Sequence, residues 1–409
     1  MRKTMAPLLL AVLVVFSAQQ LITPILAPLS RRLELTESQL GLVITTAAIA
    51  LTIASTLWGR ALDRVGVRKV LLAGLVLATL GLTGFAVASA LGLAEVLSSS
   101  SVLAVMLATR SLLFGAGIAA LPVAALAAAS AATSDEADRT KAVGLVGAVQ
   151  GISLVLGPAL GGALAVVSLT LPLYLAPALT ALLAIWVFAT ASRTPHVRPA
   201  GPRAAGVKPW EARLWPFFAI GFLLYLSLGL VQVITGFLIA DRLRLAAEET
   251  AGSVGVALFA AGLVLVAVQG AVVPKLAWPA VRLMRAGAPI AVAGFVLLAL
   301  AGQLWSITAA FAVLSLGLGL ALPGFAAAPT LMVGPEQQGS VAGLVNATTG
   351  ATFIVGPLLG TALYETDPAV PIFAAAGAAA GALLLAVFSP AARRLATRAT
   401  EVAEAAPAG

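Results

Sequence analysis

The sequence predicts an all-helical polytopic membrane protein built from two similar six-helix bundles. Of its 409 residues, 61% are hydrophobic and only 10% are charged, whereas a soluble domain carries about 25% charged residues. The mean hydropathy is +1.07. One stretch also occurs twice, because residues 143–164 align without a gap on residues 342–363 with 11 identical positions of 22. An apolar helix repeated half a chain apart indicates a duplicated membrane body, which is a plan of secondary transporters.

The identical positions of this repeat are concentrated in glycine and proline. These residues set how closely helices approach and where they bend, whereas exchanges among large apolar side chains cost little in lipid. We therefore expect the two copies to preserve one shape. The paired positions are Gly144/Gly343, Gly151/Gly350, Gly157-Pro158/Gly356-Pro357 and Gly161/Gly360.

Apolar runs long enough to cross a bilayer define the helices in order. The first run follows Met1-Arg2-Lys3 and has the outline of a secretory signal peptide. It continues to Leu29, and its removal would break the symmetry of the halves, so we interpret it as the first span. The twelve predicted spans are residues 6–29, 39–60, 70–91, 101–128, 142–167, 170–191, 214–240, 251–273, 286–304, 306–332, 341–364 and 369–389.

A long polar connection rich in proline divides the chain. It predicts an N-terminal bundle over residues 1–191, a cytoplasmic linker over 192–213, a C-terminal bundle over 214–390 and a frayed cytoplasmic tail over 391–409. With the N-terminus inside, 19 of the 24 Lys and Arg residues fall in inner segments and 4 in outer ones. The positive-inside rule then places both termini in the cytoplasm of a plasma-membrane protein.

The loop between the second and third spans reads Gly59-Arg60-Ala61-Leu62-Asp63-Arg64-Val65-Gly66-Val67-Arg68-Lys69. It resembles the loop signature of the major facilitator superfamily, with matches at Gly59, Asp63, Arg64, Gly66, Arg68 and Lys69. Ala61 and Val67 depart from that signature. The two glycines are expected to permit a tight turn. The resemblance implies that the loop is a latch which stabilises the outward-open conformation. The alternative is that the loop is only a positively charged cytoplasmic segment in which Asp63 has no specific role.

The fifth span resembles the antiporter motif of proton-coupled drug exporters in the same superfamily. The matching residues are Gly144, Gly157, Pro158, Gly161 and Gly162, with Ser153 in place of a glycine. Small residues at this spacing allow close helix packing, and the proline removes a backbone hydrogen bond. Generic helix packing is the alternative explanation.

Arg110 is the one charged residue that the sequence places deep in a span, about 14 Å from the start of the fourth. A buried charge in a bilayer is costly unless it faces a cavity or a partner. Its surroundings resemble the helix-4 signature of the superfamily. We expect a role in substrate contact or proton coupling, with a structural arginine bound to carbonyls or to Gln20 as the alternative.

All sixteen acidic residues fall at span ends or in loops, so no carboxylate is expected at mid-membrane. Coupling could run through Asp63 or Asp241 at the membrane edges, through Arg110, or be absent. The other polar and aromatic residues within spans are candidates for lining a central cavity, although helix packing explains each of them equally well. These candidates are Gln20, Thr23, Phe114, Gln150, Tyr225, Gln232, Phe325, Asn346 and Thr349.

The sequence features together indicate secondary transport by alternating access, in the form of efflux of drug-like or amphipathic organic compounds, with exchange for protons left open. An uptake carrier or facilitator for a small metabolite is the alternative. A polytopic membrane protein without transport activity, an enzyme or a receptor, is the remote alternative. An enzyme is disfavoured because there is no cysteine and a single histidine, His196, which leaves almost nothing for catalysis, a metal or another cofactor. The net charge of +8 follows from the inner loops, so nucleic acid is not an expected partner. The expected partners are a small organic substrate, protons if coupled, and lipid around a monomer.

Overall fold

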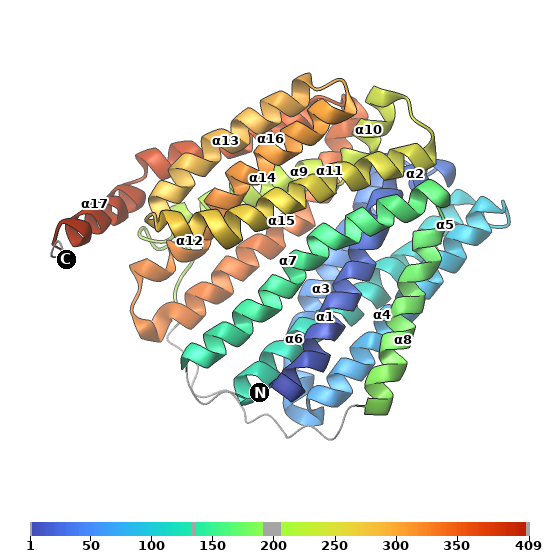
Figure 1. Ribbon diagram of the computed structural model, residues 1–409, viewed down its shortest axis with the longest axis horizontal. Coiled ribbons are helices and arrows are strands. Elements are labelled where there is room, and N and C mark those ends of the chain that lie inside the picture. The colour runs from blue at the N-terminus through green and yellow to red at the C-terminus, as the bar shows by residue number, and fades with distance from the viewer. Residues whose placement is uncertain (1, 133–135, 191–205, 406–409) are drawn as a thin grey trace. The chain divides into compact units, whose positions relative to one another are not determined.

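The computed structural model describes residues 2–132, 136–190 and 206–405, and every regular element within these ranges is helical. Figure 1 shows the long helices lying roughly side by side within each part of the chain. Twelve helical stretches are long and apolar enough to cross a membrane, which confirms the predicted class and number of spans. They are Leu8–Arg32, Glu37–Val65, Val67–Leu93, Ser99–Ala128, Leu145–Val167, Leu171–Ala189, Trp215–Gln232, Ala247–Leu276, Ala280–Leu300, Leu304–Met332, Gln338–Thr366 and Val370–Phe388.

Four of the described spans are interrupted helices. The first consists of α1 (Arg2–Ile22), a short 3-10 turn (Thr23–Ile25) and α2 (Leu26–Arg32). Pro24 and Pro28 account for this break, because each removes a backbone donor. In the fourth span, a π-helical segment (Leu107–Leu113) separates α5 (Ser99–Met106) from α6 (Phe114–Ala132). The eighth has a second one (Val268–Val272) between α11 (Ala247–Ala267) and α12 (Val273–Leu276). In the tenth, α14 (Leu304–Ala327) is followed after two residues by a 3-10 turn (Thr330–Met332).

The remaining helices run with few breaks. In the first half they are α3 (Glu37–Val65), α4 (Val67–Leu93), α7 (Glu136–Val167) and α8 (Leu171–Thr190). The second half contains α9 (Trp215–Gln232), α10 (Thr235–Leu243), α13 (Ala280–Leu300), α14 (Leu304–Ala327), α15 (Gln338–Thr366), α16 (Val370–Phe388) and α17 (Pro390–Ala405). The tail expected to be frayed is therefore helical up to Ala405, and that expectation was wrong.

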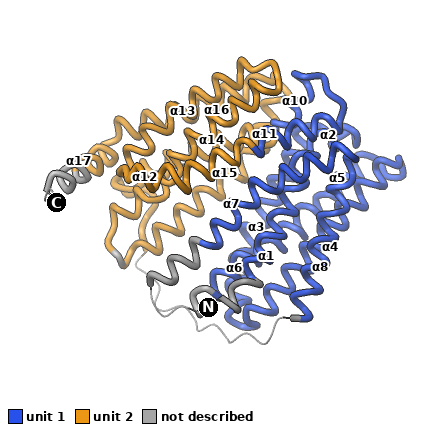
Figure 2. The backbone as a smooth tube through the Cα atoms, in the orientation of Figure 1, with its two compact units in different colours: residues 1–200, 234–259 blue, residues 201–233, 260–409 orange. Residues whose placement is uncertain are grey.

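Two compact units make up the fold. One contains residues 1–200 and 234–259, and the other contains residues 201–233 and 260–409 (Figure 2). Helix α10 and the start of α11 thus belong to the same unit as the N-terminal helices. The predicted linker lies largely in residues 191–205, outside the described part of the chain. The domain limits inferred from the sequence stay a prediction.

Helices of the two units pack in matching pairs. In the first unit, α1 packs on α7 and α8, while α4 packs on α6 and α8. Their counterparts α9 and α13 do the same in the second unit, where α9 packs on α15 and α16, and α13 on α14 and α16. The repeat seen in the sequence is therefore a repeat of packing.

Equivalent glycines make the same close backbone contacts in the two units. A Cβ added to Gly117 would come within 2.4 Å of the backbone nitrogen of Ala78, and one added to Gly317 within 2.4 Å of that of Ala291. Distances this short exclude any side chain, so both α4–α6 and α13–α14 need glycine where their backbones touch.

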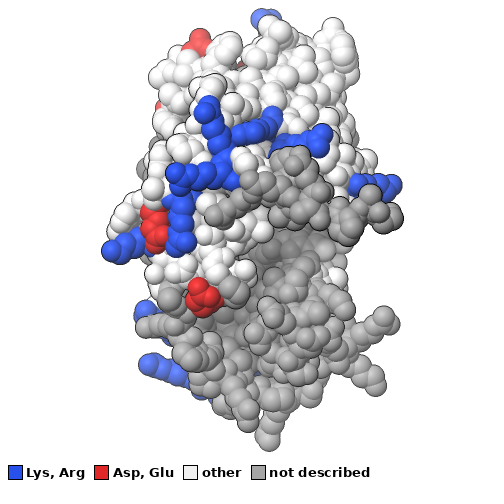
Figure 3. All heavy atoms as spheres, turned by 90° about the vertical axis from the view of Figure 1, so that its left-hand side faces the viewer, with Lys and Arg blue, Asp and Glu red and all other residues white. Residues whose placement is uncertain are grey.

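Positive charge is clustered on the face that Figure 3 turns to the viewer. Figure 3 shows Lys and Arg side chains clustered there with few acidic ones among the atoms drawn in colour. This clustering agrees with the charge bias on which the orientation is based. The orientation itself remains a prediction.

Candidate functional site

The loop after the second span is tighter than its sequence suggests. Helix α3 continues to Val65, so Gly59 lies inside it and not in a turn. Gly66 alone makes the turn, with φ 81° and ψ 165°, and its N–H donates to the Leu62 carbonyl oxygen at 2.9 Å. That backbone conformation is open almost only to glycine. The prediction of a turn is correct, but one glycine makes it.

Asp63 and Arg68 have separate surroundings. Asp63 is exposed and, among the described residues, has no hydrogen bond or ion pair. The Nη2 atom of Arg68 instead donates to the Phe188 carbonyl oxygen at 3.2 Å, close to the C-terminal end of α8. A cation at this end stabilises the last carbonyls of a helix. Arg68 therefore links the loop to α8, and Asp63 is unengaged in this conformation.

Arg285 has the same relation to the last helix of the second unit. Its Nε donates to the Ala386 carbonyl oxygen at 2.9 Å and its Nη2 to the Val387 carbonyl oxygen at 3.4 Å, near the end of α16. Sequence reasoning assigned Arg285 no role. The signal available in the sequence was that the third span of each half has an arginine near its start, Arg68 in the first half and Arg285 in the second.

The helix-5 motif is a packing surface. A Cβ on Gly157 would lie 2.2 Å from the Cβ of Gln20, and one on Gly161 would lie 2.1 Å from the Leu21 carbonyl oxygen. Gly162 faces α11, where an added Cβ would lie 2.7 Å from the Gly255 Cα. The motif thus holds α7 against α1 on one side and α11 on the other. The surroundings of Gly144 lie outside the described side chains.

Gly255 is a member of this surface that sequence reasoning missed. An added Cβ there would lie 2.9 Å from the Pro158 carbonyl oxygen. Nothing in the spacing of glycines in the eighth span distinguishes it from the others, so only the contact with α7 reveals it. Ser153, the residue that departs from the motif, accepts a hydrogen bond from the Ser17 hydroxyl at 3.2 Å.

Arg110 is buried in the π-helical segment, with 6% of its surface exposed. Its guanidinium carbon lies 4.7 Å from the centroid of the Phe114 ring, so the structure brings these two predicted residues together. No described residue accepts a hydrogen bond from its buried Nε. Gln20, the suggested structural partner, packs against Gly157. π-helical turns occur often at functional sites, and this one displays a cation without an acidic partner among the described residues.

An aromatic cluster occupies the second unit. The rings of Tyr225 and Phe325 meet edge-on with centroids 6.1 Å apart, and Phe353 lies 6.4 Å from Tyr225. The Tyr225 hydroxyl bonds to the side chain of Thr349. Phe325 packs on Gly221, where an added Cβ would fall 2.1 Å from the ring. Phe353 was missed because its position in the apolar α15 gives no polar signal.

Among the described residues, no hydrogen bond or ring contact joins the remaining candidates to one another. Gln20, Thr23, Gln150 and Gln232 are half-buried, and Asn346 is exposed. Three of these lie in the first unit together with Arg110, and two lie in the second with Tyr225. That both sets line one cavity stays a prediction.

The described residues contain few buried ionisable side chains. None of their acidic side chains is buried, and no cluster of His, Cys, Asp and Glu there could hold a metal ion. The buried polar groups are hydroxyls and one guanidinium. Such a set can bind and orient an organic compound through stacking and hydrogen bonds.

Comparisons with known proteins agree with this picture. A family model described as Major Facilitator Superfamily matches residues 8–346. The class G tetracycline resistance protein of Vibrio anguillarum is 27% identical over 358 residues, which cover 84% of this chain and 86% of the relative. The class B protein of Escherichia coli is 28% identical, with 84% of each chain covered. The quinolone resistance protein NorA of Staphylococcus aureus (strain MSSA476) is 24% identical over 387 residues, covering 92% and 94%.

Solved structures share the fold. A bacterial homologue of the iron transporter ferroportin in an inward-facing state gives a TM-score of 0.73 at 14% identity, covering 95% of this chain and 98% of that one. The human organic anion transporter MFSD10 gives 0.64 at 18% identity, covering 94% and 99%. At these identities the similarity concerns the fold alone.

Proposed function

The chain belongs to the Major Facilitator Superfamily, and on that premise we propose that it exports amphipathic organic compounds from the cell by alternating access. The observation that carries this proposal is its similarity, over more than four fifths of its length, to tetracycline and quinolone resistance proteins. The superfamily consists of membrane transporters, and the described residues contain twelve candidate spans. The protein is therefore a multi-pass membrane protein, which we place in the inner membrane as a monomer with both termini in the cytoplasm.

Two groups of side chains support an organic substrate with a ring system. Arg110 on Phe114 offers a cation beside an aromatic face, and Tyr225 with Phe325 and Phe353 offers rings of different tilt beside a hydroxyl. Rings bind flat apolar surface, while one cation and a few hydroxyls orient polar substituents. A sugar carrier would need a denser set of hydrogen-bonding side chains. Gln20, Thr23, Gln150, Gln232 and Asn346 are assigned to the same substrate path.

The loop and the helix-5 motif are assigned to the conformational cycle. We assign the latch role to the loop around Asp63, whose carboxylate is free to engage in another conformation. The surface of Gly157, Pro158, Gly161 and Gly162 keeps α1, α7 and α11 in close contact, as expected of helices that seal one side of the carrier. Exchange for protons is part of the proposal, although the described residues place no carboxylate in the core.

Transport assays test the proposal directly. Cells that lack their own drug exporters should accumulate less ethidium, tetracycline or quinolone when they express this chain, and an Arg110→Ala variant expressed at equal level should lose the effect. Purified protein in vesicles should release protons from an acidic lumen when a substrate is added outside. Greater accumulation of a compound in expressing cells would establish the uptake alternative and overturn efflux.

A further inference from the structure

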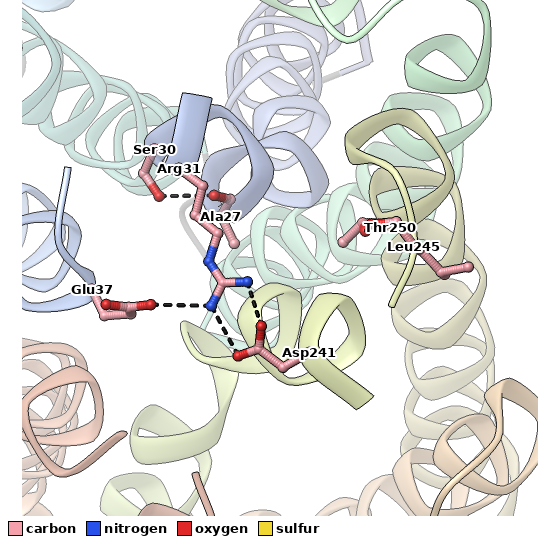
Figure 4. A network of polar contacts seen from close by, with 7 residues as sticks. All are labelled: Ala27, Ser30, Arg31, Glu37, Asp241, Leu245 and Thr250. Atoms are coloured by element: carbon pink, nitrogen blue, oxygen red, sulfur yellow. Dashed lines mark hydrogen bonds and ion pairs between the residues drawn. The ribbon is translucent and has the colours of Figure 1, made fainter. Parts of the chain in front are cut away.

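Two arginines at the end of the first span are paired with acids that lie more than 200 residues away. The guanidinium of Arg31 donates through both of its terminal nitrogens to Asp241, with an Nη2–Oδ2 distance of 2.9 Å, and through Nη2 to Glu37 at 3.1 Å (Figure 4). Arg32 donates to both carboxylate oxygens of Glu248 at 2.8 Å. The arginines close α2, whereas the acids of the long-range pairs lie on α10 and in the first turn of α11.

Close packing lies directly beneath these pairs. The Arg31 guanidinium carbon lies 5.1 Å from the centroid of the Phe237 ring on α10. A Cβ added to Gly236 would fall 2.5 Å from the Cβ of Ala27, so α10 rests on α2 at a point where only glycine fits. Both helices belong to one compact unit. The ion pairs therefore fasten a contact that is also shaped for close approach.

In both long-range pairs the cation lies on α2 and the acid lies on α10 or α11. Both cations come from the end of the first span. Asp241 comes from the segment between the seventh and eighth spans, and Glu248 comes from the start of the eighth. The side chains of Arg31 and Asp241 are 37% and 38% exposed. Pairs that are exposed to this degree stabilise weakly and are screened by salt, so they can open without the cost of stranding a buried charge. That property suits a contact that must form and break.

We propose that Arg31–Asp241 and Arg32–Glu248 form an outer clasp, which fastens α10 and α11 to the end of the first span whenever the carrier is closed to the outside. This proposal rests on one part of the proposed function, which is that the carrier works by alternating access. Helix α10 follows α9 along the chain with two residues between them. In this proposal, opening the outer side moves α10 with α9 away from α2 and breaks both pairs. The number of intact pairs then sets the fraction of time that the carrier is closed outside.

Outer opening can be measured without any substrate. The chain contains no cysteine, so a single Ala27→Cys change gives a unique thiol, and Ala27 is only 4% exposed beneath Gly236. An impermeant maleimide added to intact cells should label it only when α10 leaves α2. In this background, Arg31→Asp should raise the labelling rate about fivefold, the factor that a partly exposed ion pair contributes to an equilibrium.

Two further variants complete the test. The reciprocal change Arg31→Asp with Asp241→Arg should return labelling part of the way to the parent rate. It restores the pair with its charges exchanged, whereas the contact with Glu37 is then one between like charges. Arg244→Asp is the matched control. Arg244 caps the C-terminal end of α10, the helix that carries Asp241, but it has no ion pair among the described residues. Unchanged labelling in Arg31→Asp, or equal labelling in the reciprocal and single variants, would overturn the clasp.

Cross-linking gives an independent reading. In an Arg31→Cys, Asp241→Cys variant, a short cleavable reagent that bridges two thiols should stop transport, and cleavage should restore it. Continued transport by the bridged protein would overturn the clasp. Because the labelling assay needs no substrate, a labelling response in a protein that exports nothing would retain the clasp and reject the proposed efflux.

Discussion

Gly161 of α7 lies directly on the backbone of Leu21 in α1, so closely that an added Cβ would come 2.1 Å from the Leu21 carbonyl oxygen. In the second unit, Gly360 of α15 stands in the same relation to Leu230 of α9, at 2.3 Å. The two glycines occupy equivalent positions of the sequence repeat. What the repeat conserves is therefore a backbone contact between the first and fifth helix of each half.

Alanine at either of these glycines should destabilise the protein. A methyl group that meets backbone atoms forces the helices apart, and overpacking of this kind costs about 1–3 kcal/mol. We expect Gly161→Ala and Gly360→Ala to lower the thermal unfolding temperature of purified protein in detergent by similar amounts. Gly147→Ala is the control, because nothing lies within 4 Å of its added Cβ. Equal stability of all three variants would contradict the contact.

The arginines that bond to the ends of α8 and α16 should act on stability and not on transport. Hydrogen bonds from a charged group contribute about 1.5–3 kcal/mol, so Arg68→Gln and Arg285→Gln should each lower the unfolding temperature. Arg64→Gln should not, because Arg64 is exposed and unpaired among the described residues. Loss of transport in Arg68→Gln at unchanged stability would instead assign Arg68 to the latch.

The sequence was sufficient for the architecture because hydropathy and the spacing of glycines act locally. Twelve apolar runs could be read in order, and the repeated Gly157-Pro158 and Gly161 indicated close packing before the partners were known. The same locality explains what was missed. Gly255 matters only because α7 passes over it, and Phe353 only because Tyr225 is adjacent.

The long-range ion pairs could not be predicted from the sequence for a related reason. Arg31 and Asp241 could be placed at span ends, but charge alone does not select one partner among the acids of the outer segments. The π-helical segment around Arg110 was likewise invisible, since it depends on how the fourth helix packs against the second and third. Hydropathy predicts that a residue is in the membrane and not which neighbour it meets.

Asp63→Asn should slow transport without altering stability. The carboxylate is exposed and unpaired among the described residues, so the folded conformation seen here gains nothing from its charge. A latch that engages only in the alternate conformation would lose about 1.4 kcal/mol on neutralisation, which corresponds to about a tenfold change in the conformational equilibrium. We expect an unchanged unfolding temperature and a turnover in vesicles reduced by about that factor. Normal turnover would count against the latch, and Asp63→Glu is the control that retains the charge.

Arg110 is the residue for which we predict the largest effect on transport. A cation 6% exposed and without an acidic partner among the described residues is costly in a membrane protein unless binding uses it. Its contact with the Phe114 ring offsets part of that cost, because a cation on an aromatic face contributes about 0.5–2 kcal/mol.

We expect Arg110→Ala to abolish transport while the protein remains folded, since removing a costly buried charge offsets part of the packing that is lost with the side chain. Arg110→Lys should recover only part of the activity, because an ammonium group lacks the planar guanidinium that lies on Phe114. Phe114→Leu is the matched change on the other side of the contact, and it should reduce transport while leaving the charge in place. An Arg110→Ala variant that transports normally, with the pH profile of the parent protein, would assign this arginine to helix packing.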